Sequence, residues 1–365
     1  MTAPGARPAG EPPSPLLGQA ELRGRLSRLL TADRLHPCLL FVGPPGIGKR
    51  GLARWLAMHR NCDEPGAPCG RCWSCRQIDR GAHPDVLEVL PDPEKATPVI
   101  GVAQARALMG QLSLHRSHAR TRFVLIDEAD RLTPEAANAL LLTLEEPPDG
   151  TMFVLMTGRP SALLSTVRSR CQRVNLRPVP ASELGGWLSD RGLADADWLA
   201  AMAEGCPGRA LSLAEGEAER WRSVRDELLH AISGEIWAFF GLAERVAKGD
   251  KADKARLAGE QAIVLDVLER LLQDALAHTA GRPARFHADR PEIVAAWAGG
   301  LGVPGVARMG LELDLARQML AEHVNARLVF DALILRLAAE LGGARRAGAG
   351  LGPPAAPTPA GGHDA

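Results

Sequence analysis

The glycine-rich run GPPGIGK at residues 43–49 is the feature that most limits what this chain can fold into. It follows a short apolar run, Cys38–Val42, and precedes a helical pattern over residues 52–59. Strand, glycine-rich turn and helix in this order are typical of a P-loop, in which backbone N–H groups and a helix N-terminus hold phosphate. A glycine-rich turn that binds nothing is the alternative. The candidate phosphate-binding residues are Gly43, Gly46, Gly48 and Lys49.

Short apolar runs alternate with helical patterns over the first half of the chain. The runs Val86–Leu90, Phe123–Ile126 and Met152–Met156 have the length of buried parallel strands. Helical patterns cover residues 102–114 and 136–145, the second after Thr133 as N-cap and a proline at the first helical position. This alternation predicts a doubly wound α/β domain with its ligand at the carboxyl ends of the strands.

The alternation of short apolar runs with helical patterns ends near residues 175–180, which sets the first domain boundary. Beyond it strand signals fade, and helical patterns dominate, as at 263–276 and 313–341. The Pro-rich start and the Gly-, Ala- and Pro-rich end lack apolar periodicity, so we expect both to be disordered. The expected division is a disordered start at 1–15, an α/β domain at 16–178, a helical unit at 179–240, a second helical unit at 245–342 and a disordered tail at 343–365.

Position 50 departs from the P-loop pattern. A Ser or Thr hydroxyl there ligates the Mg²⁺ that bridges the β- and γ-phosphates, whereas this chain has Arg50. A guanidinium near the metal would repel it by several kcal/mol at an effective dielectric constant of about 20. Either Arg50 swings away and binding is poor in metal, or the loop is kept only for its fold. Both outcomes argue against efficient hydrolysis, and whether ATP and Mg²⁺ bind stays open.

The acidic sequence at 127–130 provides the second half of a nucleotide site. Asp127 is placed after a buried strand to hold Mg²⁺ or its waters, and Glu128 to polarise an attacking water. The letters DEAD suggest a helicase, but a helicase needs a second α/β motor domain, and the downstream chain is helical. Alternatively, the acids merely cap the next helix.

Four cysteines, Cys62, Cys69, Cys72 and Cys75, lie within fourteen residues rich in turn formers. Cys-x2-Cys spacing presents two thiolates at once, and Zn²⁺ prefers tetrahedral sulfur. A closed four-thiolate site leaves no position for water, so we expect a structural zinc knuckle at 62–75. Free cysteines or a redox pair are the alternatives. Cys38, Cys171 and Cys206 are expected to be packing residues.

Charge and composition limit the partners. Lys plus Arg and Asp plus Glu both total 43, so no net field draws the chain to nucleic acid or to a membrane. No apolar run approaches the roughly 18 residues of a membrane span, and the start lacks the apolar segment of a signal peptide, so we expect a soluble cytoplasmic protein. Aromatic residues are 4% of the chain and Tyr is absent, which argues against base-stacking platforms.

A set of motifs carries a family resemblance: the P-loop helix with its four-cysteine insertion, then His83-Pro84-Asp85, NALLLTLEEPP at 138–148, and Ser169-Arg170-Cys171. The chain resembles the bacterial clamp-loader family of AAA+ proteins, well over residues 16–180, through a lid at 205–211, and more faintly in the helical end. The resemblance implies an AAA+ α/β domain with a zinc-knuckle insertion, a small helical lid and an all-α collar that holds subunits together.

The resemblance also implies partners and roles. It predicts a hetero-pentamer with gamma/tau and delta subunits that opens a sliding clamp and places it on primed DNA, as part of a DNA-directed DNA polymerase holoenzyme. Arg170 matches the arginine finger that reaches into a neighbour's ATP site, where a guanidinium stabilises the γ-phosphate in the transition state. Arg209 matches the lid arginine that senses nucleotide. An exposed salt bridge is the alternative for Arg170, with Arg168 and Arg173 nearby.

Within the family the chain looks like the delta′ type rather than the gamma/tau motor type. A motor subunit should keep Gly-Lys-Thr in the loop and a polar sensor after the fourth strand, whereas this chain has Arg50 and Gly158. Leu142 stands where relatives usually have Lys. Asp127 and Glu128 are intact, so an active gamma/tau-type ATPase remains an alternative. A second alternative is a zinc-stabilised P-loop module that contacts DNA through Arg116, Arg120 and Arg122.

Overall fold

The computed structural model describes residues 16–64, 68–95, 98–233, 254–322 and 324–346, and it divides into two compact units, Met1–Leu213 and Ala214–Ala365. Of the segments expected to be disordered, 1–15 and residues 347–365 of the tail lie outside the described residues, whereas residues 343–346 of the tail are helical. The finer division into a lid at 179–240 and a collar at 245–342 stays a prediction, since residues 234–253 at its junction lie outside them as well.

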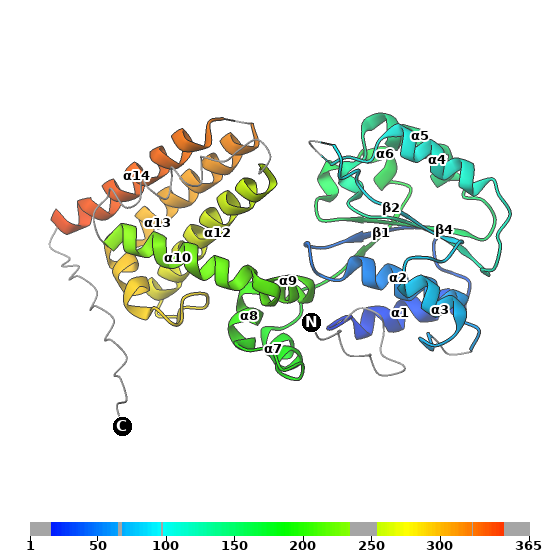
Figure 1. Cartoon of the computed structure of the whole chain (residues 1–365), viewed down its shortest axis with the longest axis horizontal. Coiled ribbons are helices and arrows are strands. Elements are labelled where there is room, and N and C mark those ends of the chain that lie inside the picture. Colours follow the sequence, from blue (N-terminus) through cyan, green and yellow to red (C-terminus); the bar gives the residue numbers. More distant parts are fainter. Residues whose placement is uncertain (1–15, 65–67, 96–97, 234–253, 323, 347–365) are drawn as a thin grey trace, which may run out of the picture. The chain divides into compact units, whose positions relative to one another are not determined.

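A parallel sheet forms the centre of the first unit, with strand order β2-β3-β4-β1-β5 (Figure 1). Its strands are β1 (Cys38–Val42), β2 (Val86–Val89), β3 (Arg122–Ile126), β4 (Thr151–Thr157) and β5 (Gln172–Asn175). The first four confirm the predicted strands. β5 carried no apolar signal because it is an edge strand whose residues are largely exposed. Val42 pairs with Thr157, so β1 and β4 end side by side.

Helices cover both faces of this sheet (Figure 1). Alternate strand residues divide between two cores: Leu39 and Phe41 pack with α2 (Lys49–Asn61), whereas Leu40 and Val42 pack with α4 (Val102–Leu112) and α5 (Pro134–Glu145). One face carries α1 (Ala20–Thr31), α2 (Lys49–Asn61) and α3 (Trp73–Asp79), and the other α4 (Val102–Leu112), α5 (Pro134–Glu145) and α6 (Ser165–Arg168). β1 and β3 are buried along their whole length, as strands covered on both faces should be.

Helix starts follow the predicted chemistry where the sequence was explicit. Thr133 Oγ1 accepts the backbone N–H of Ala136 at 3.2 Å, and Pro134 occupies the first turn of α5. The predicted N-cap is therefore confirmed. Three further helices complete the first unit after the sheet: α7 (Ala181–Ser189), α8 (Ala196–Ala203) and α9 (Pro207–Ser212).

The second unit is helical in its described residues, as the sequence predicted. Its helices are α10 (Ala218–Ser233), α12 (Lys254–Thr279), α13 (Pro291–Ala321) and α14 (Ala326–Arg346). α13 contains a kink, where Gly302 has a φ of +56° and Pro304 follows. α14 continues beyond residue 342, where the helical unit was expected to end. Among the described helices, none is both long enough and apolar enough to cross a membrane.

Candidate functional site

The P-loop joins β1 to α2 through two glycines in the left-handed region, Gly46 with a φ of +76° and Gly48 with a φ of +99°. Residues with a Cβ rarely adopt this conformation, so the turn depends on glycine. Lys49 folds back on the loop, and its Nζ donates to the carbonyl oxygens of Gly43 at 2.8 Å and Pro44 at 3.0 Å. Burial lowers the pKa of Lys49, while the Asp127 carboxylate acts in the opposite direction.

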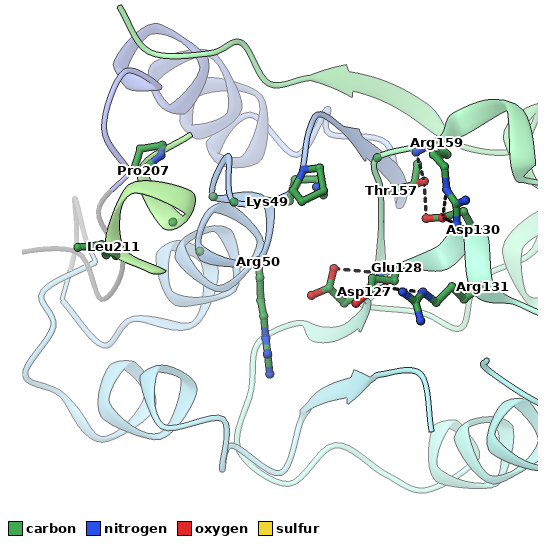
Figure 2. Close-up of a pocket in the computed structure, with 16 residues that line it drawn as sticks. Lys49, Arg50, Asp127, Glu128, Asp130, Arg131, Thr157, Arg159, Pro207 and Leu211 are labelled. Carbon is green, nitrogen blue, oxygen red and sulfur yellow. Dashed lines mark hydrogen bonds and ion pairs between the residues drawn. The ribbon is translucent and has the colours of Figure 1, made fainter. Parts of the chain in front are cut away.

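The loop opens into a cleft of about 960 Å³ at the carboxyl ends of the strands. Three sets of residues line it: the P-loop with the start of α2, the segments after β3 and β4, and the start of α9 (Figure 2). They include Pro45, Gly46, Gly48, Lys49, Arg50, Asp127, Glu128, Asp130, Arg131, Thr157, Gly158, Arg159, Pro207, Gly208 and Leu211. The structure therefore brings the P-loop and the acidic segment together, as the sequence predicted.

Arg50 is directed away from Lys49 (Figure 2). Its Nη2 lies 2.5 Å and its Nε 3.1 Å from Glu88 Oε2 on β2. Arg54, one turn later on α2, binds the same carboxylate through Nε at 2.6 Å and Nη2 at 3.0 Å. Burial alone would raise the pKa of Glu88, but the hydrogen bonds from Arg54 and Arg50 outweigh burial and hold this pKa below its usual value. Sequence reasoning missed Glu88, since nothing in a strand pattern marks a single acid as a partner.

The two acids after β3 have partners of their own. Asp127 Oδ1 accepts the backbone N–H of Glu128 at 3.0 Å. Glu128 has a φ of +46°, a conformation uncommon for a residue other than glycine, and its carboxylate binds Arg131 Nε at 2.6 Å. The carboxylate that would polarise water is therefore engaged in an ion pair.

A third acid, Asp130, organises the position expected for a sensor. Its Oδ1 accepts the hydroxyl of Thr157 at 2.7 Å, and its Oδ2 accepts Arg159 Nε and Nη2 at 3.0 and 2.9 Å (Figure 2). These bonds outweigh burial and keep the pKa of Asp130 below its usual value. Gly158 lies between the two partners and has no side chain to offer. In the sequence, Asp130 stood out only as the last residue of the acidic segment 127–130, which did not reveal its partners.

Helix α9 packs directly on the P-loop. The backbone N–H of Gly208 donates to Gly46 O at 2.8 Å, and a Cβ on Gly46 would lie 2.7 Å from the backbone nitrogen of Arg209. Arg209 therefore adjoins the loop through its backbone, while its Nη1 lies 3.4 Å from Glu204 Oε2. The family resemblance implied a nucleotide-sensing role for Arg209, which stays a prediction, and no sequence pattern marked Gly208 as a contact of the P-loop.

The four cysteines meet between the end of α2 and the start of α3, a helix the sequence did not predict. Their Sγ atoms all lie within 4.8 Å of one another, and in a tetrahedral zinc site with Zn–S bonds of about 2.3 Å the sulfurs are about 3.8 Å apart. Backbone N–H groups donate to three of the sulfurs, at 3.5 Å to Cys62, 3.3 Å to Cys69 and 3.4 Å to Cys72. The donor set and spacing fit Zn²⁺ after a small contraction.

The His83-Pro84-Asp85 motif is a buried support for the loop after α4. Asp85 accepts the backbone N–H groups of Ser117, His118 and Ala119 at 2.8–3.1 Å. His83 Nδ1 accepts the backbone N–H of Asp85 at 3.1 Å. The exposed ring of Trp73, beside the cysteines, contacts His83 and His118 with centroid distances of 5.2 and 4.9 Å.

One residue assigned to a possible DNA contact is in the interior. Arg122 is 5% exposed, and its Nη1 donates to the carbonyl oxygens of Gln111, Leu112 and Leu114 at 3.0–3.2 Å. Its guanidinium therefore closes the end of α4. The prediction that Arg122 contacts DNA is wrong, because its guanidinium is buried and donates hydrogen bonds to backbone carbonyl oxygens.

Arg170 lies just after α6 and is not among the residues that line the cleft of its own chain. Its Nε donates to Glu145 Oε1 at 2.6 Å, and its Nη2 contacts the same oxygen. Its Nη1 donates to Thr166 O at 2.8 Å. Glu145, the last residue of α5, was not singled out in the sequence, although it belongs to the LEEPP segment.

Comparisons with known proteins identify relatives of this chain. Residues 18–180 match the family model described as DNA polymerase III, delta subunit. The delta′ subunit of DNA polymerase III from Escherichia coli K12 is 34% identical over 315 residues, which cover 84% of this chain and 90% of that protein. The delta′ subunit from Bacillus subtilis is 40% identical over 164 residues, 44% of this chain and 49% of that protein.

A tau subunit matches a shorter part of the chain than the delta′ subunit of the same organism does. The tau subunit of DNA polymerase III from Escherichia coli K12 is 34% identical over 171 residues, 46% of this chain and 26% of that protein. A solved gamma subunit-related protein of Thermotoga maritima aligns with 20% identity and a TM-score of 0.45, over 87% of this chain and 99% of its own. The family assignment rests on the sequence relatives.

Proposed function

This chain belongs to the family of DNA polymerase III delta′ subunits, and we propose that it works as a clamp-loader subunit with little or no ATPase activity of its own. In this proposal it assembles with gamma/tau and delta subunits into a hetero-pentamer that loads the sliding clamp onto primed DNA. The match over 84% of the chain to a delta′ subunit carries the proposal. The pairing of Arg50 with Glu88 supports its second part.

The chemistry of the cleft supports weak hydrolysis. With Arg50 in place of a hydroxyl, the P-loop offers no oxygen ligand for Mg²⁺ at that position. Glu128 Oε2 is held by Arg131 Nε at 2.6 Å, so one of the two oxygens that could polarise water is already engaged. Lys49 is still available to nucleotide once it leaves Gly43 and Pro44, and Asp127 retains the carboxylate that a metal needs. The site can therefore bind phosphate more readily than it can cleave it.

Arg170 is the residue through which the chain would act in hydrolysis. Its side chain is 31% exposed and is held at the end of α5, where a neighbouring subunit's ATP could reach it. An arginine that spreads charge over the γ-phosphate oxygens stabilises the transition state without any nucleotide bound to its own chain. The subunit would then stimulate a partner's site while hydrolysing nothing itself.

The cysteine cluster has a separate, structural role in this proposal. Cys62, Cys69, Cys72 and Cys75 would hold Zn²⁺, which when bound supplies a crosslink between the end of α2 and the start of α3. Four sulfur ligands fill the coordination sphere, so no catalytic step belongs to this site.

An active gamma/tau-type ATPase is the second candidate, favoured by the intact Lys49, Asp127 and Glu128. ATP turnover by the isolated chain, and by the chain mixed with a gamma/tau-type subunit, separates the two. We expect no turnover above background from the isolated chain and clear turnover from the mixture. Robust turnover by the isolated chain, abolished by Lys49→Ala, would overturn the proposal in favour of the motor type.

A further inference from the structure

Glu145 is a carboxylate in an unfavourable place. It is the last residue of α5, which stops because Pro147 and Pro148 cannot continue the helix. The C-terminus of a helix carries partial negative charge, so an acid there is disfavoured unless a cation is near. Arg170 supplies that cation, with Nε and Nη2 both on Glu145 Oε1. Arg170 therefore stabilises the charge of Glu145, and Glu145 in turn fixes the position of the Arg170 guanidinium.

Arg170 is fixed from two sides. Besides Glu145 it binds the carbonyl oxygen of Thr166 on α6 through Nη1 at 2.8 Å, with Ser169 Oγ at 3.5 Å from the same nitrogen. A guanidinium has five N–H groups, so these contacts leave an N–H of Nη2 without a partner among the described residues. The guanidinium is therefore anchored through four of its N–H groups, and the fifth can still donate a hydrogen bond to an anion.

The neighbouring arginines are held differently. Arg168 Nη1 donates to the carbonyl oxygen of Pro160 at 3.2 Å, and Arg173 Nε to the side-chain oxygen of Asn175 at 2.8 Å. Of the three cations in this segment, Arg170 is the one that pairs with a carboxylate in the described part of the chain. The anchoring is thus specific to the arginine of the SRC motif.

From this geometry we propose that Glu145 is a positioning residue for Arg170. It holds Nε and one N–H of Nη2, and so presents the remaining N–H of Nη2 to the γ-phosphate of ATP on the neighbouring subunit. The inference rests on the proposed function of Arg170. Because an anchored guanidinium has fewer conformations to lose when it meets phosphate, the pair increases turnover rather than nucleotide affinity.

The test is steady-state ATP turnover by the complete assembly, reconstituted with Glu145→Gln, Arg170→Ala, or both changes in this chain. Glu145→Gln keeps the size of the side chain but loses its charge, and we expect kcat to fall about tenfold with KM for ATP unchanged. The double variant should be no slower than Arg170→Ala alone, because Glu145 acts only through Arg170. Glu146→Gln, at the adjacent exposed acid, is the matched control and should leave turnover unchanged.

Two further measurements keep the outcomes distinct. Subunit association, followed by gel filtration, and thermal unfolding should match the unsubstituted chain for each variant; if Glu145→Gln is poorly folded, Glu145→Asp replaces it and should restore part of the rate. Unchanged kcat in Glu145→Gln, with Arg170→Ala impaired, overturns this inference alone. Unchanged kcat in Arg170→Ala overturns the arginine finger itself. A double variant slower than Arg170→Ala shows that Glu145 acts by another route and also overturns the inference.

Discussion

The backbone N–H of Gly208 lies 2.8 Å from the carbonyl oxygen of Gly46, and this bond joins the first turn of α9 to the P-loop. The two glycines are in direct contact: a Cβ on Gly208 would lie 3.0 Å from Gly46 O and 3.1 Å from Gly46 Cα. Both approaches involve backbone atoms, which cannot yield as a flexible side chain can. The contact of α9 with the phosphate loop therefore requires glycine on both sides.

Gly208→Ala should destabilise the first unit by about 1–3 kcal/mol, because the added methyl group pushes α9 away from the loop. Urea denaturation followed by circular dichroism measures the change. Gly186→Ala is the matched control, since Gly186 lies within α7 with nothing within 4 Å of its would-be Cβ. This control should gain about 0.5–1 kcal/mol from the better helix propensity of alanine. Equal effects at the two sites would contradict the packing argument.

Arg50→Thr should restore a hydroxyl ligand and make nucleotide binding respond to Mg²⁺. We expect at least a tenfold gain in affinity for ATP on adding Mg²⁺, about 1.4 kcal/mol, in titrations of the isolated chain. Arg54→Thr is the control, because it takes the other arginine from Glu88 and leaves position 50 unchanged. A gain of the same size in both variants would show that freeing Glu88, rather than adding a ligand, is responsible.

Freshly purified protein should contain about one zinc ion per chain, as a closed four-thiolate site predicts. Replacing Cys69 and Cys72 by Ser should remove the metal and lower the unfolding temperature, since the crosslink between α2 and α3 is lost. Elemental analysis and calorimetry measure the two effects. Cys171→Ser is the control: burial raises the pKa of Cys171 to about 11, so its thiol stays protonated, and metal content should not change. Metal-free wild-type protein would refute the site.

Acid should destabilise the first unit in two stages. Burial lowers the pKa of His83, so the folded chain favours the neutral ring, and stability begins to fall as the pH drops below the usual histidine value of about 6.5. Burial raises the pKa of Asp85, but the backbone N–H groups of His118, Ala119 and Ser117 outweigh it and leave this pKa below the usual 3.8. The contribution of Asp85 is therefore complete above about pH 5 and is lost as the pH falls through its lowered pKa.

Substituting Asp85 tests the second stage. Asp85→Asn should cost about 1–3 kcal/mol at neutral pH, because backbone donors lose their charged acceptor, and should flatten the decline in stability below pH 5. Urea denaturation at a series of pH values measures both effects. Asp149→Asn, at an exposed turn, should change neither. A decline below pH 5 that is as steep in Asp85→Asn as in the unsubstituted chain would assign it to other groups.

Local chemistry explains what the sequence could predict. The apolar runs of β1 and β3 are buried on both faces, and Thr133-Pro134 starts α5, because each depends on neighbouring residues alone. β5 and α3 were missed because an exposed edge strand and a seven-residue helix inside a cysteine cluster lack periodicity. The partners Glu88 and Glu145 were missed because each pair joins residues 25 or more positions apart, which no local pattern encodes.

The shared carboxylate of Glu88 has a consequence for how the chain tolerates change. Because Arg54 also binds Glu88, removing the arginine at position 50 leaves this half-buried acid with a partner. Residue 50 can therefore change without leaving an unpaired carboxylate on β2 of the sheet. A P-loop that lacks the hydroxyl ligand for Mg²⁺ and one that has it are then separated by a single substitution that the ion pair of Glu88 with Arg54 does not oppose.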